Sequence, residues 1–274
     1  MGYIRFENIV KNFGDTQVLK NISLDIEKGQ LVTLLGPSGC GKSTLLRCLA
    51  GLERVTSGKV WLDGKDITNE EPRKRDIGMV FQQYSLFPNL TVEKNVAFGL
   101  QLKKMPKNQI DTKVKEMLEI VGLGDKGKSY PSQLSGGQQQ RAALARAIVT
   151  EPKVLLLDEP LSAIDALLRK SLQMEIRRIQ KETDITAIFV THDQNEAMAM
   201  SDMIHLLYDG RIEQSAEPAQ MYARPATKFA ASFIGSYNLL SSEDFKKMTG
   251  SSAEAETIAF RPESVRLSLE RPDD

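Results

Sequence analysis

The stretch that most constrains the fold is GPSGCGKST, residues 36–44. It follows a continuously apolar run at 30–36 and precedes a helical pattern at 43–50, which predicts a loop between a buried strand and a helix. Its spacing fits G-x-x-x-x-G-K-[ST], in which glycines let backbone N–H groups surround a phosphate at a helix N-terminus. The alternative, a glycine-rich turn beside a surface lysine, fits this context poorly. We expect the loop to bind a nucleoside triphosphate through Gly36, Pro37, Ser38, Gly39, Cys40, Gly41, Lys42, Ser43 and Thr44.

Two further apolar runs, at 153–159 and 185–193, resemble the first and indicate strands of a parallel sheet that helices cover on both faces. Helical patterns at 107–121, 136–149, 166–182 and 194–200 alternate with them. Apolar–polar alternation at 3–27 and a tight Asp63-Gly64 turn predict antiparallel strands. The interval 86–150 lacks a buried-strand pattern. We therefore expect an α/β core at 1–85 and 151–235, a helical subdomain at 86–150, and a boundary near 235, where the composition turns small and polar.

The composition sets limits on partners. Lys+Arg and Asp+Glu both total 36, so the net charge is zero and gives no reason to expect nucleic acid as a partner. Eight residues of loop and helix separate Cys40 from Cys48, or roughly 12 Å, which is too far for a disulfide. Free thiols, together with the lack of a signal or membrane-spanning pattern, favour a cytosolic protein that meets a membrane only through a partner.

Two acidic residues end the run VLLLDEP at 154–160. Parallel α/β sheets bind ligands at the carboxyl ends of their strands, so Asp158 and Glu159 should lie beside the phosphate loop. We expect Lys42 to reach the β- and γ-phosphates, and Ser43 and Asp158 to hold Mg²⁺. Glu159 should point the other way, as adjacent strand residues do, and polarise the attacking water. A pair of solvated acids at a strand end is the alternative.

His192 ends another apolar run, AIFVTHD, and should lie at the same sheet edge, where an imidazole can hydrogen-bond a γ-phosphate. His205 has no such placement and is interpreted as structural. The sequence LSGGQ at 134–138 forms a capping box, with Ser135 at the N-cap and Gln138 three residues later. The box does not explain Gly136 and Gly137. Bare backbone at a helix N-terminus suits an anion, so the chain has two predicted phosphate-binding helix starts.

In this order the phosphate loop, LSGGQ, LLLDEP and THD resemble the nucleotide-binding subunits of ABC transporters, over residues 3 to about 235. The resemblance implies a P-loop NTPase core and a head-to-tail homodimer. Each ATP, with Mg²⁺, would lie between one copy's phosphate loop and the other copy's Ser135, Gly136, Gly137 and Gln138. It also implies that Gln82 links Mg²⁺ and water to the membrane partner, that Asp165 lies in an interfacial loop, and that Phe13 stacks on adenine. A core position is the alternative for Phe13.

The stretch SLFPNLTVEKNVAFGL at 85–100 resembles the importer branch that serves iron, polyamines, sugars and organophosphonates. There, a groove receives a short helix of the permease; Leu86, Phe87, Leu90 and Val92 are candidates, although some must be core. The resemblance implies permease subunits, an extracytoplasmic solute-binding protein and a peripheral position at the cytoplasmic face of the inner membrane. Residues 236–274 resemble a short, truncated OB-like extension. An exporter ATPase and a non-transport ABC protein acting on nucleic acid are the alternatives.

Overall fold

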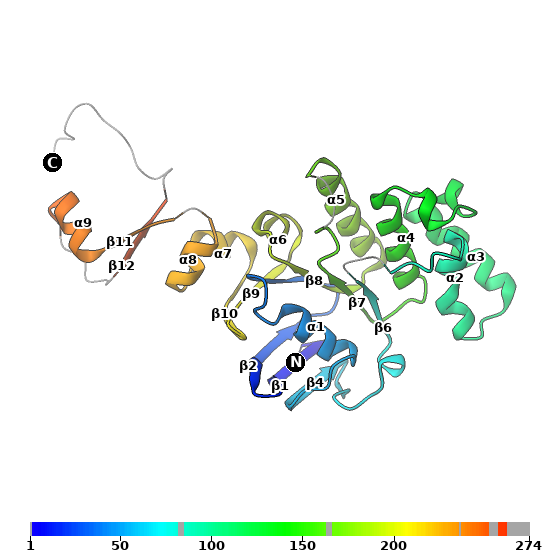
Figure 1. Cartoon of the computed structure of the whole chain (residues 1–274), viewed down its shortest axis with the longest axis horizontal. Helices are drawn as coiled ribbons and strands as arrows, with labels where there is room; N and C mark the ends of the chain where they lie inside the picture. Colours follow the sequence, from blue (N-terminus) through cyan, green and yellow to red (C-terminus); the bar gives the residue numbers. More distant parts are fainter. Residues whose placement is uncertain (1, 82–84, 163–165, 236, 252–256, 262–274) are drawn as a thin grey trace.

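The computed structural model describes residues 2–81, 85–162, 166–235, 237–251 and 257–261. Its centre is a six-stranded sheet in the order β10-β9-β3-β8-β7-β6, in which all neighbours are parallel except β10 and β9. The strands are β3 (Leu31–Leu35), β6 (Ile77–Val80), β7 (Val154–Asp158), β8 (Thr186–Thr191), β9 (Met203–Tyr208) and β10 (Arg211–Ala216). The predicted α/β core of parallel strands covered by helices is confirmed, and the antiparallel strand β10 at one edge makes the sheet mixed (Figure 1).

Strands β7 and β8 are buried along their whole length because each face of the sheet has its own core. Leu155 and Leu157 of β7 pack into one cluster with helices α2 (Val92–Leu102), α3 (Lys107–Ile120), α4 (Gly136–Ile148) and α5 (Ala166–Thr183). Val154 and Leu156 point to the opposite face and pack with helix α1 (Lys42–Ala50). This alternation decides which side chains leave the strand ends on which side.

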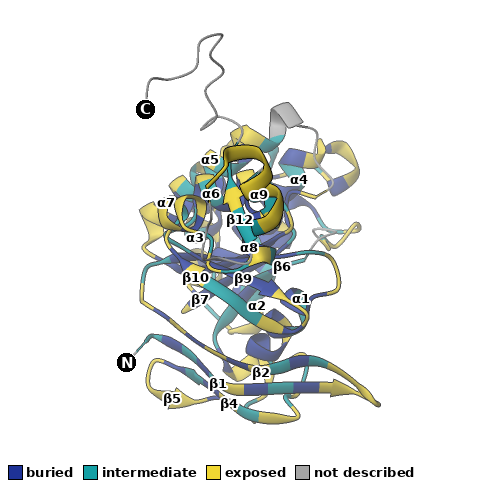
Figure 2. Cartoon of the chain, turned by 90° about the vertical axis from the view of Figure 1, so that its left-hand side faces the viewer, coloured by how far each residue is buried: buried dark blue, intermediate teal, exposed yellow. Residues whose placement is uncertain are grey.

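A second sheet of four antiparallel strands, in the order β2-β1-β4-β5, lies on the α1 side of the molecule (Figures 1 and 2). Asp63 and Gly64 both have positive φ, as the predicted tight turn requires. Its strands are β1 (Ile4–Phe13), β2 (Thr16–Ile26), β4 (Ser57–Leu62) and β5 (Lys65–Asp66). The apolar face of this sheet packs into the same cluster as α1 and Cys40, so the sheet supports the phosphate loop from one side.

The interval between β6 and β7 contains α2, α3 and α4, of which α2 has no counterpart among the helical ranges expected from sequence. Asn95 of α2 is fully buried and donates to three carbonyls of the preceding loop, those of Phe87, Leu90 and Thr91, each at 3.1 Å. An asparagine that holds a loop in this way weakens the apolar pattern of the helix that carries it. This explains why periodicity alone did not resolve α2.

After β10 the chain forms helices α7 (Pro218–Ala223) and α8 (Lys228–Phe233), and then β11 (Asn238–Ser241), α9 (Ser242–Thr249) and β12 (Thr257–Phe260). Strands β11 and β12 pair antiparallel, apart from the main body (Figure 1). The guanidinium of Arg261 stacks on the rings of Tyr222 and Tyr237 and donates to the Tyr222 carbonyl. The OB-like character of this segment and the boundary near 235 stay predictions.

No helix in the described ranges is both long and apolar enough to cross a membrane. Cys40 and Cys48 are buried free thiols, as expected from their spacing. Burial raises the pKa of the Cys48 thiol to about 11. Burial also lowers the pKa of His205 to about 4, and this histidine shares a hydrogen bond of 2.7 Å with the Ser215 hydroxyl. A buried neutral imidazole between two strands agrees with a structural role.

Candidate nucleotide site

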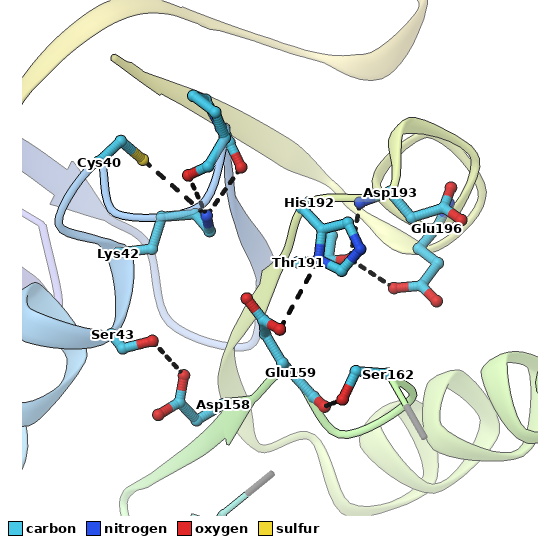
Figure 3. A network of polar contacts seen from close by, with 12 residues as sticks. Cys40, Lys42, Ser43, Asp158, Glu159, Ser162, Thr191, His192, Asp193 and Glu196 are labelled. Carbon is cyan, nitrogen blue, oxygen red and sulfur yellow. Dashed lines mark hydrogen bonds and ion pairs between the residues drawn. The ribbon is translucent and has the colours of Figure 1, made fainter. Parts of the chain in front are cut away.

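Three neighbouring strands deliver the predicted functional segments to one edge of the central sheet. Leu35, the last residue of β3, pairs with Thr191, the last residue of β8, while Asp158 at the end of β7 pairs with Val190. The phosphate loop, the Asp-Glu pair and His192 follow directly from these strand ends (Figure 3). The sheet order β3-β8-β7 therefore brings together residues that lie more than a hundred positions apart in the sequence.

The phosphate loop needs its glycines for space as well as for backbone shape. Gly36 (φ 154°) leaves no room for a Cβ, which would lie under 3.0 Å from both the Leu207 carbonyl oxygen and Cys40 Sγ. A Cβ on Gly41 (φ 103°) would lie 2.7 Å from Leu19 Cδ2. Ser38 and Gly39 are exposed at the tip of the loop. The loop therefore packs tightly at its two ends and is open to a ligand between them.

Lys42 is buried, and its ammonium lies inside the loop. Nζ donates to the carbonyls of Gly36 (2.7 Å) and Pro37 (2.8 Å) and lies 3.9 Å from Cys40 Sγ (Figure 3). Burial of a cation is costly unless dipoles or anions surround it. The loop carbonyls hold this charge at the start of α1, where a phosphate group would compensate it further.

Helix α1 begins with an N-terminus that no described side chain caps: its N-cap is Gly41, in the left-handed conformation, and its first turn has no acidic residue. In contrast, Thr91, Ser135 and Asp193 cap α2, α4 and helix α6 (Gln194–Met200) with their side chains. The first N–H groups of a helix have no intrahelical partner and attract anions. The first turn of α1 is thus open to an anionic ligand.

Ser43 and Asp158 form the predicted pair of oxygen donors. The Ser43 hydroxyl donates to Asp158 Oδ1 at 2.6 Å, and Arg47 of α1 lies 4.0 Å from the other carboxylate oxygen. Asp158 is 5% exposed. A hydroxyl and a carboxylate in contact are the hard oxygen ligands that Mg²⁺ prefers, and Mg²⁺ usually keeps several waters besides one or two protein ligands. The donor set therefore suits a magnesium ion.

Glu159 turns away from Asp158 and toward His192, as the alternation of the strand predicts (Figure 3). Its φ of 46° starts a turn in which its carbonyl accepts the Ser162 hydroxyl at 3.0 Å. Glu159 Oε2 lies 3.7 Å from His192 Nδ1, with the histidine side chain 54% exposed. A cavity of about 30 Å³ lies between these two residues and Glu196, which is room for one water molecule.

A buried carboxylate that the sequence reasoning missed supports the histidine loop. Glu196 of α6 is 4% exposed and accepts the Thr191 hydroxyl at 2.6 Å, while that hydroxyl accepts the Asp193 backbone N–H at 3.0 Å. Arg169 of α5 lies 3.8 Å from Glu196 and 3.6 Å from Asp193. Burial raises the pKa of Glu196. Only the i,i+5 spacing from Thr191 across a strand-to-helix turn could have indicated this contact.

The LSGGQ segment folds as the expected capping box. The Ser135 side chain accepts from Gln138 N (3.3 Å), and Gln138 Oε1 accepts from Ser135 N (2.9 Å). Gly136 is exposed, and a Cβ built there would meet nothing within 4 Å among the described residues. Gly137 is buried in the first turn of α4. The described part of the chain itself therefore does not require a glycine at position 136.

The other residues predicted for the site lie at the end of β1, along the phosphate loop, or outside the described residues. Phe13 ends β1 with 46% of its surface exposed, so a core position is wrong. Pro37, Ser43 and Thr44 are half-buried along the loop and the first turn of α1. Gln82 and Asp165 lie outside the described residues, after β6 and before α5.

Comparison with known proteins identifies the family. The family model described as "ABC transporter" matches residues 19–162. The sulfate/thiosulfate import ATP-binding protein CysA of Thermosynechococcus vestitus is 50% identical over 98% of this chain and 80% of its own length. The spermidine/putrescine import ATP-binding protein PotA of Thermobifida fusca is 55% identical over 86% of this chain and 63% of that protein. The Fe(3+) ions import ATP-binding protein FbpC of Brucella abortus is 52% identical over 88% and 69%.

Solved structures agree with this assignment. The dimeric ATP-binding cassette MJ0796, in a post-hydrolysis state bound to ADP and Pi, is 34% identical and superposes with a TM-score of 0.69 over 78% of this chain and 98% of that one. The protein cbiO1 from Clostridium perfringens, part of the transporter complex cbiONQ, is 31% identical with a TM-score of 0.76 over 81% and 91%. The chain belongs to the ABC transporter family, as one of its ATP-hydrolysing nucleotide-binding subunits.

Proposed function

We propose that this chain is the motor subunit of an ABC importer, which couples ATP binding and hydrolysis to solute uptake through a separate permease. The observation that carries the proposal is the convergence at one sheet edge of an open phosphate loop, the Ser43–Asp158 oxygen pair and the Glu159–His192 pair. Relatives named for import disfavour the alternatives of an exporter and of a protein acting on nucleic acid.

Phosphoryl transfer relies on positioning and charge stabilisation, and the site residues divide these tasks. Lys42 and the N–H groups of α1 bind the phosphates. Ser43 and Asp158 would hold Mg²⁺, with Gln82 as a further proposed ligand. Mg²⁺, when bound, neutralises charge that develops on the phosphate oxygens.

Glu159 is proposed to orient and polarise the attacking water, and His192 to hydrogen-bond the γ-phosphate. The cavity of about 30 Å³ beside both side chains supports this assignment because it has room for one water. The exposure of His192 leaves its ring accessible from outside the chain. Both residues thus act at the open side of the site, whereas Lys42 and Asp158 are buried within it.

We propose a head-to-tail homodimer in which the LSGGQ segment acts on the partner's nucleotide. Gly136 has open space around it, so its bare backbone has no reason within the described chain and suits an approaching anion. Ser135, Gly137 and Gln138 would complete the contact, and Asp165 would lie in the loop between the copies. Loss of the γ-phosphate would remove the bridge and open the dimer, a population shift driven by ligand contacts.

The permease helix is proposed to dock beside Phe87. This ring is 38% exposed and packs against Phe98 (4.7 Å between centroids), with the Arg146 guanidinium 5.4 Å from its centroid. Leu86 and Leu90 are partly buried beside it, whereas Val92 is core. Arg146 donates to the Ser85 carbonyl at 2.8 Å, which joins the LSGGQ helix α4 to this surface.

The solute is proposed from the relatives' names, which give sulfate or thiosulfate, polyamines and ferric ions. Sulfate was not among the solutes that the sequence suggested, and none of these three names mentions an organophosphonate. A solute-binding protein and a peripheral position on the inner membrane complete the proposal. Uptake by proteoliposomes that contain the permease encoded with this chain would identify the solute.

The hydrolysis role is tested with Glu159→Gln. We expect ATP binding to persist, turnover to fall by about a hundredfold or more, and an ATP-stabilised dimer to accumulate. Phosphate release and size-exclusion chromatography measure these effects. Glu116→Gln is the matched control, because it makes the same change at an exposed glutamate of α3. Near-normal hydrolysis by Glu159→Gln would refute the assigned role.

The shared site is tested with Ser135→Arg. This protein should bind ATP through its own phosphate loop yet fail to dimerise and to hydrolyse ATP. Loss of the helix cap costs about 0.5–2 kcal/mol of stability by itself. Ser241→Arg, which removes the N-cap of α9, controls for a generic capping defect. An active, monomeric Ser135→Arg protein would contradict the proposal.

A further inference from the structure

The side chain of Lys11 lies against the ring of Phe13. Residues i and i+2 of a strand share a face, and Lys11 Nζ lies 4.4 Å from the centroid of the Phe13 ring. The lysine is 9% exposed, whereas the ring is 46% exposed. The buried ammonium therefore covers the protein side of the ring and leaves the other face open to solvent.

Contacts with a distant segment fix the ammonium in this position. Nζ donates to the Arg54 carbonyl at 2.8 Å and lies 3.0 Å from Glu53 Oε2. The N–H groups of Leu52 and Glu53 donate to the Arg47 carbonyl, so this segment closes the C-terminal end of α1. Lys11 thus connects the ring at the end of β1 to the helix whose first turn follows the phosphate loop.

We propose that Lys11 is a positioning residue for the adenine base: it orders the Phe13 ring from behind so that its exposed face can stack on the base. The proposal deepens the proposed function and rests on the adenine role of Phe13. A cation on one face of an aromatic ring is attracted by the ring quadrupole, which favours the ring orientation that keeps this face against the cation. Ordering the ring before binding lowers the entropy lost when the base stacks on it.

A purely structural role for Lys11 makes a different prediction. If Lys11 only tied β1 to α1, its loss would weaken the binding of every ligand of the phosphate loop to a similar extent. If it positions Phe13, its loss should weaken the binding of ATP and spare inorganic tripolyphosphate, which has no base. The ratio of the two dissociation constants separates the two roles.

The test measures Mg-ATP and Mg-tripolyphosphate binding to the full chain by isothermal titration calorimetry. For Lys11→Met we expect the ATP dissociation constant to rise about three- to tenfold, with the tripolyphosphate constant unchanged. Lys11→Arg keeps a cation over the ring and should retain most of the ATP preference. Lys59→Met is the matched control, because Lys59 lies over Trp61 with the same i,i+2 spacing, at 5.4 Å, on β4.

A double variant decides whether Lys11 acts through the ring. In a Phe13→Leu background, Lys11→Met should leave the ATP preference unchanged. Suppose that Phe13→Leu lowers the preference for ATP over tripolyphosphate, as expected. Equal losses of ATP and tripolyphosphate affinity in Lys11→Met, or no loss of either, would then overturn the Lys11 proposal. If Phe13→Leu itself left that preference intact, the adenine role of Phe13 would fail and this inference with it, although phosphate binding and hydrolysis would stand.

Discussion

Arg75 offers a sharp test of how the phosphate-loop helix is held at its far end. Its side chain is buried. Within the described residues its guanidinium donates to carbonyls: those of Cys48 and Leu49 of α1 at 2.8 Å each, and those of Thr68 and Glu70 at 2.9 Å each. Burial lowers its pKa. The contacts join the C-terminus of α1 to the loop that leads into β6, beyond which Gln82 lies.

The expected cost of Arg75→Met follows from which carbonyls lose their donor. The Cys48 carbonyl also accepts from Gly51 N and keeps one partner, and the part-buried carbonyls of Thr68 and Glu70 can turn to water. The Leu49 carbonyl has no second donor among the described residues, and a buried orphaned acceptor costs about 1–3 kcal/mol. Loss of a cation at a helix C-terminus adds about 0.3–1 kcal/mol. We therefore expect the free energy of unfolding to fall by about 1–4 kcal/mol.

Urea unfolding followed by circular dichroism, with fluorescence of the single tryptophan, Trp61, as a second probe, measures this loss. Arg73→Met is the control, because the Arg73 side chain is 80% exposed and pairs with the nearby exposed Glu71. Exposed pairs of this kind contribute about 0–1 kcal/mol. If Arg75→Met cost no more than Arg73→Met, the buried guanidinium would not hold α1, and the reasoning from orphaned carbonyls would be refuted.

Two further predictions concern the site itself. Glu196→Gln should keep the hydrogen bond from the Thr191 hydroxyl and remove a buried charge. Because the pKa of Glu196 is raised in the folded protein, ionisation of this carboxyl destabilises the fold as pH rises. The wild type should therefore lose stability relative to the variant between about pH 4.5 and pH 7, which urea unfolding at both pH values measures. A constant difference across that range would contradict the assigned burial of charge. Gly36→Ala should abolish most ATP binding because its Cβ would collide with the Leu207 carbonyl. Gly39→Ala has open space for a Cβ, but the φ of 81° is strained for alanine, so this substitution should cost only about 1–2 kcal/mol in calorimetric titrations. Equal effects of the two substitutions would argue against a packed loop.

The residues that sequence reasoning could place are those whose position follows from a strand end. Asp158, Glu159 and His192 each end an apolar run, and parallel strands present their carboxyl ends at one edge, so their convergence was predictable. The capping box at Ser135 was predictable for a related reason, because its partners lie three residues apart. Local periodicity and sheet direction are enough for such residues.

Residues whose partners are distant in sequence could not be found in this way. Glu196 is an ordinary acidic residue in a short helix until α5 and the end of β8 close around it. Arg75 lies in a polar stretch, and the carbonyls that accept from it in the described structure become neighbours when α1 packs beside the loop before β6. Lys11 is a charged residue next to Asn12 near the end of β1, where a solvated side chain would be expected, yet it is buried. The environment of such residues depends on contacts with segments distant in sequence, and a periodic pattern of apolar residues does not indicate these contacts.

The two glycine-rich helix starts differ in a way that bears on how they would share a ligand in the proposed dimer. Gly41 offers α1 no side-chain cap, so the first N–H groups of α1 can serve an anion directly. Ser135, in contrast, already accepts from Gln138 N, so one donor of α4 is satisfied internally. The Ser135 hydroxyl still has its own proton to donate, since a serine hydroxyl carries one donor beside two acceptor sites. The helix start at Ser135 can therefore stay folded without nucleotide and still offer an O–H when a phosphate arrives, whereas the start at Gly41 depends on the phosphate itself. This asymmetry fits a phosphate loop that holds ATP first and an LSGGQ segment that closes on it second.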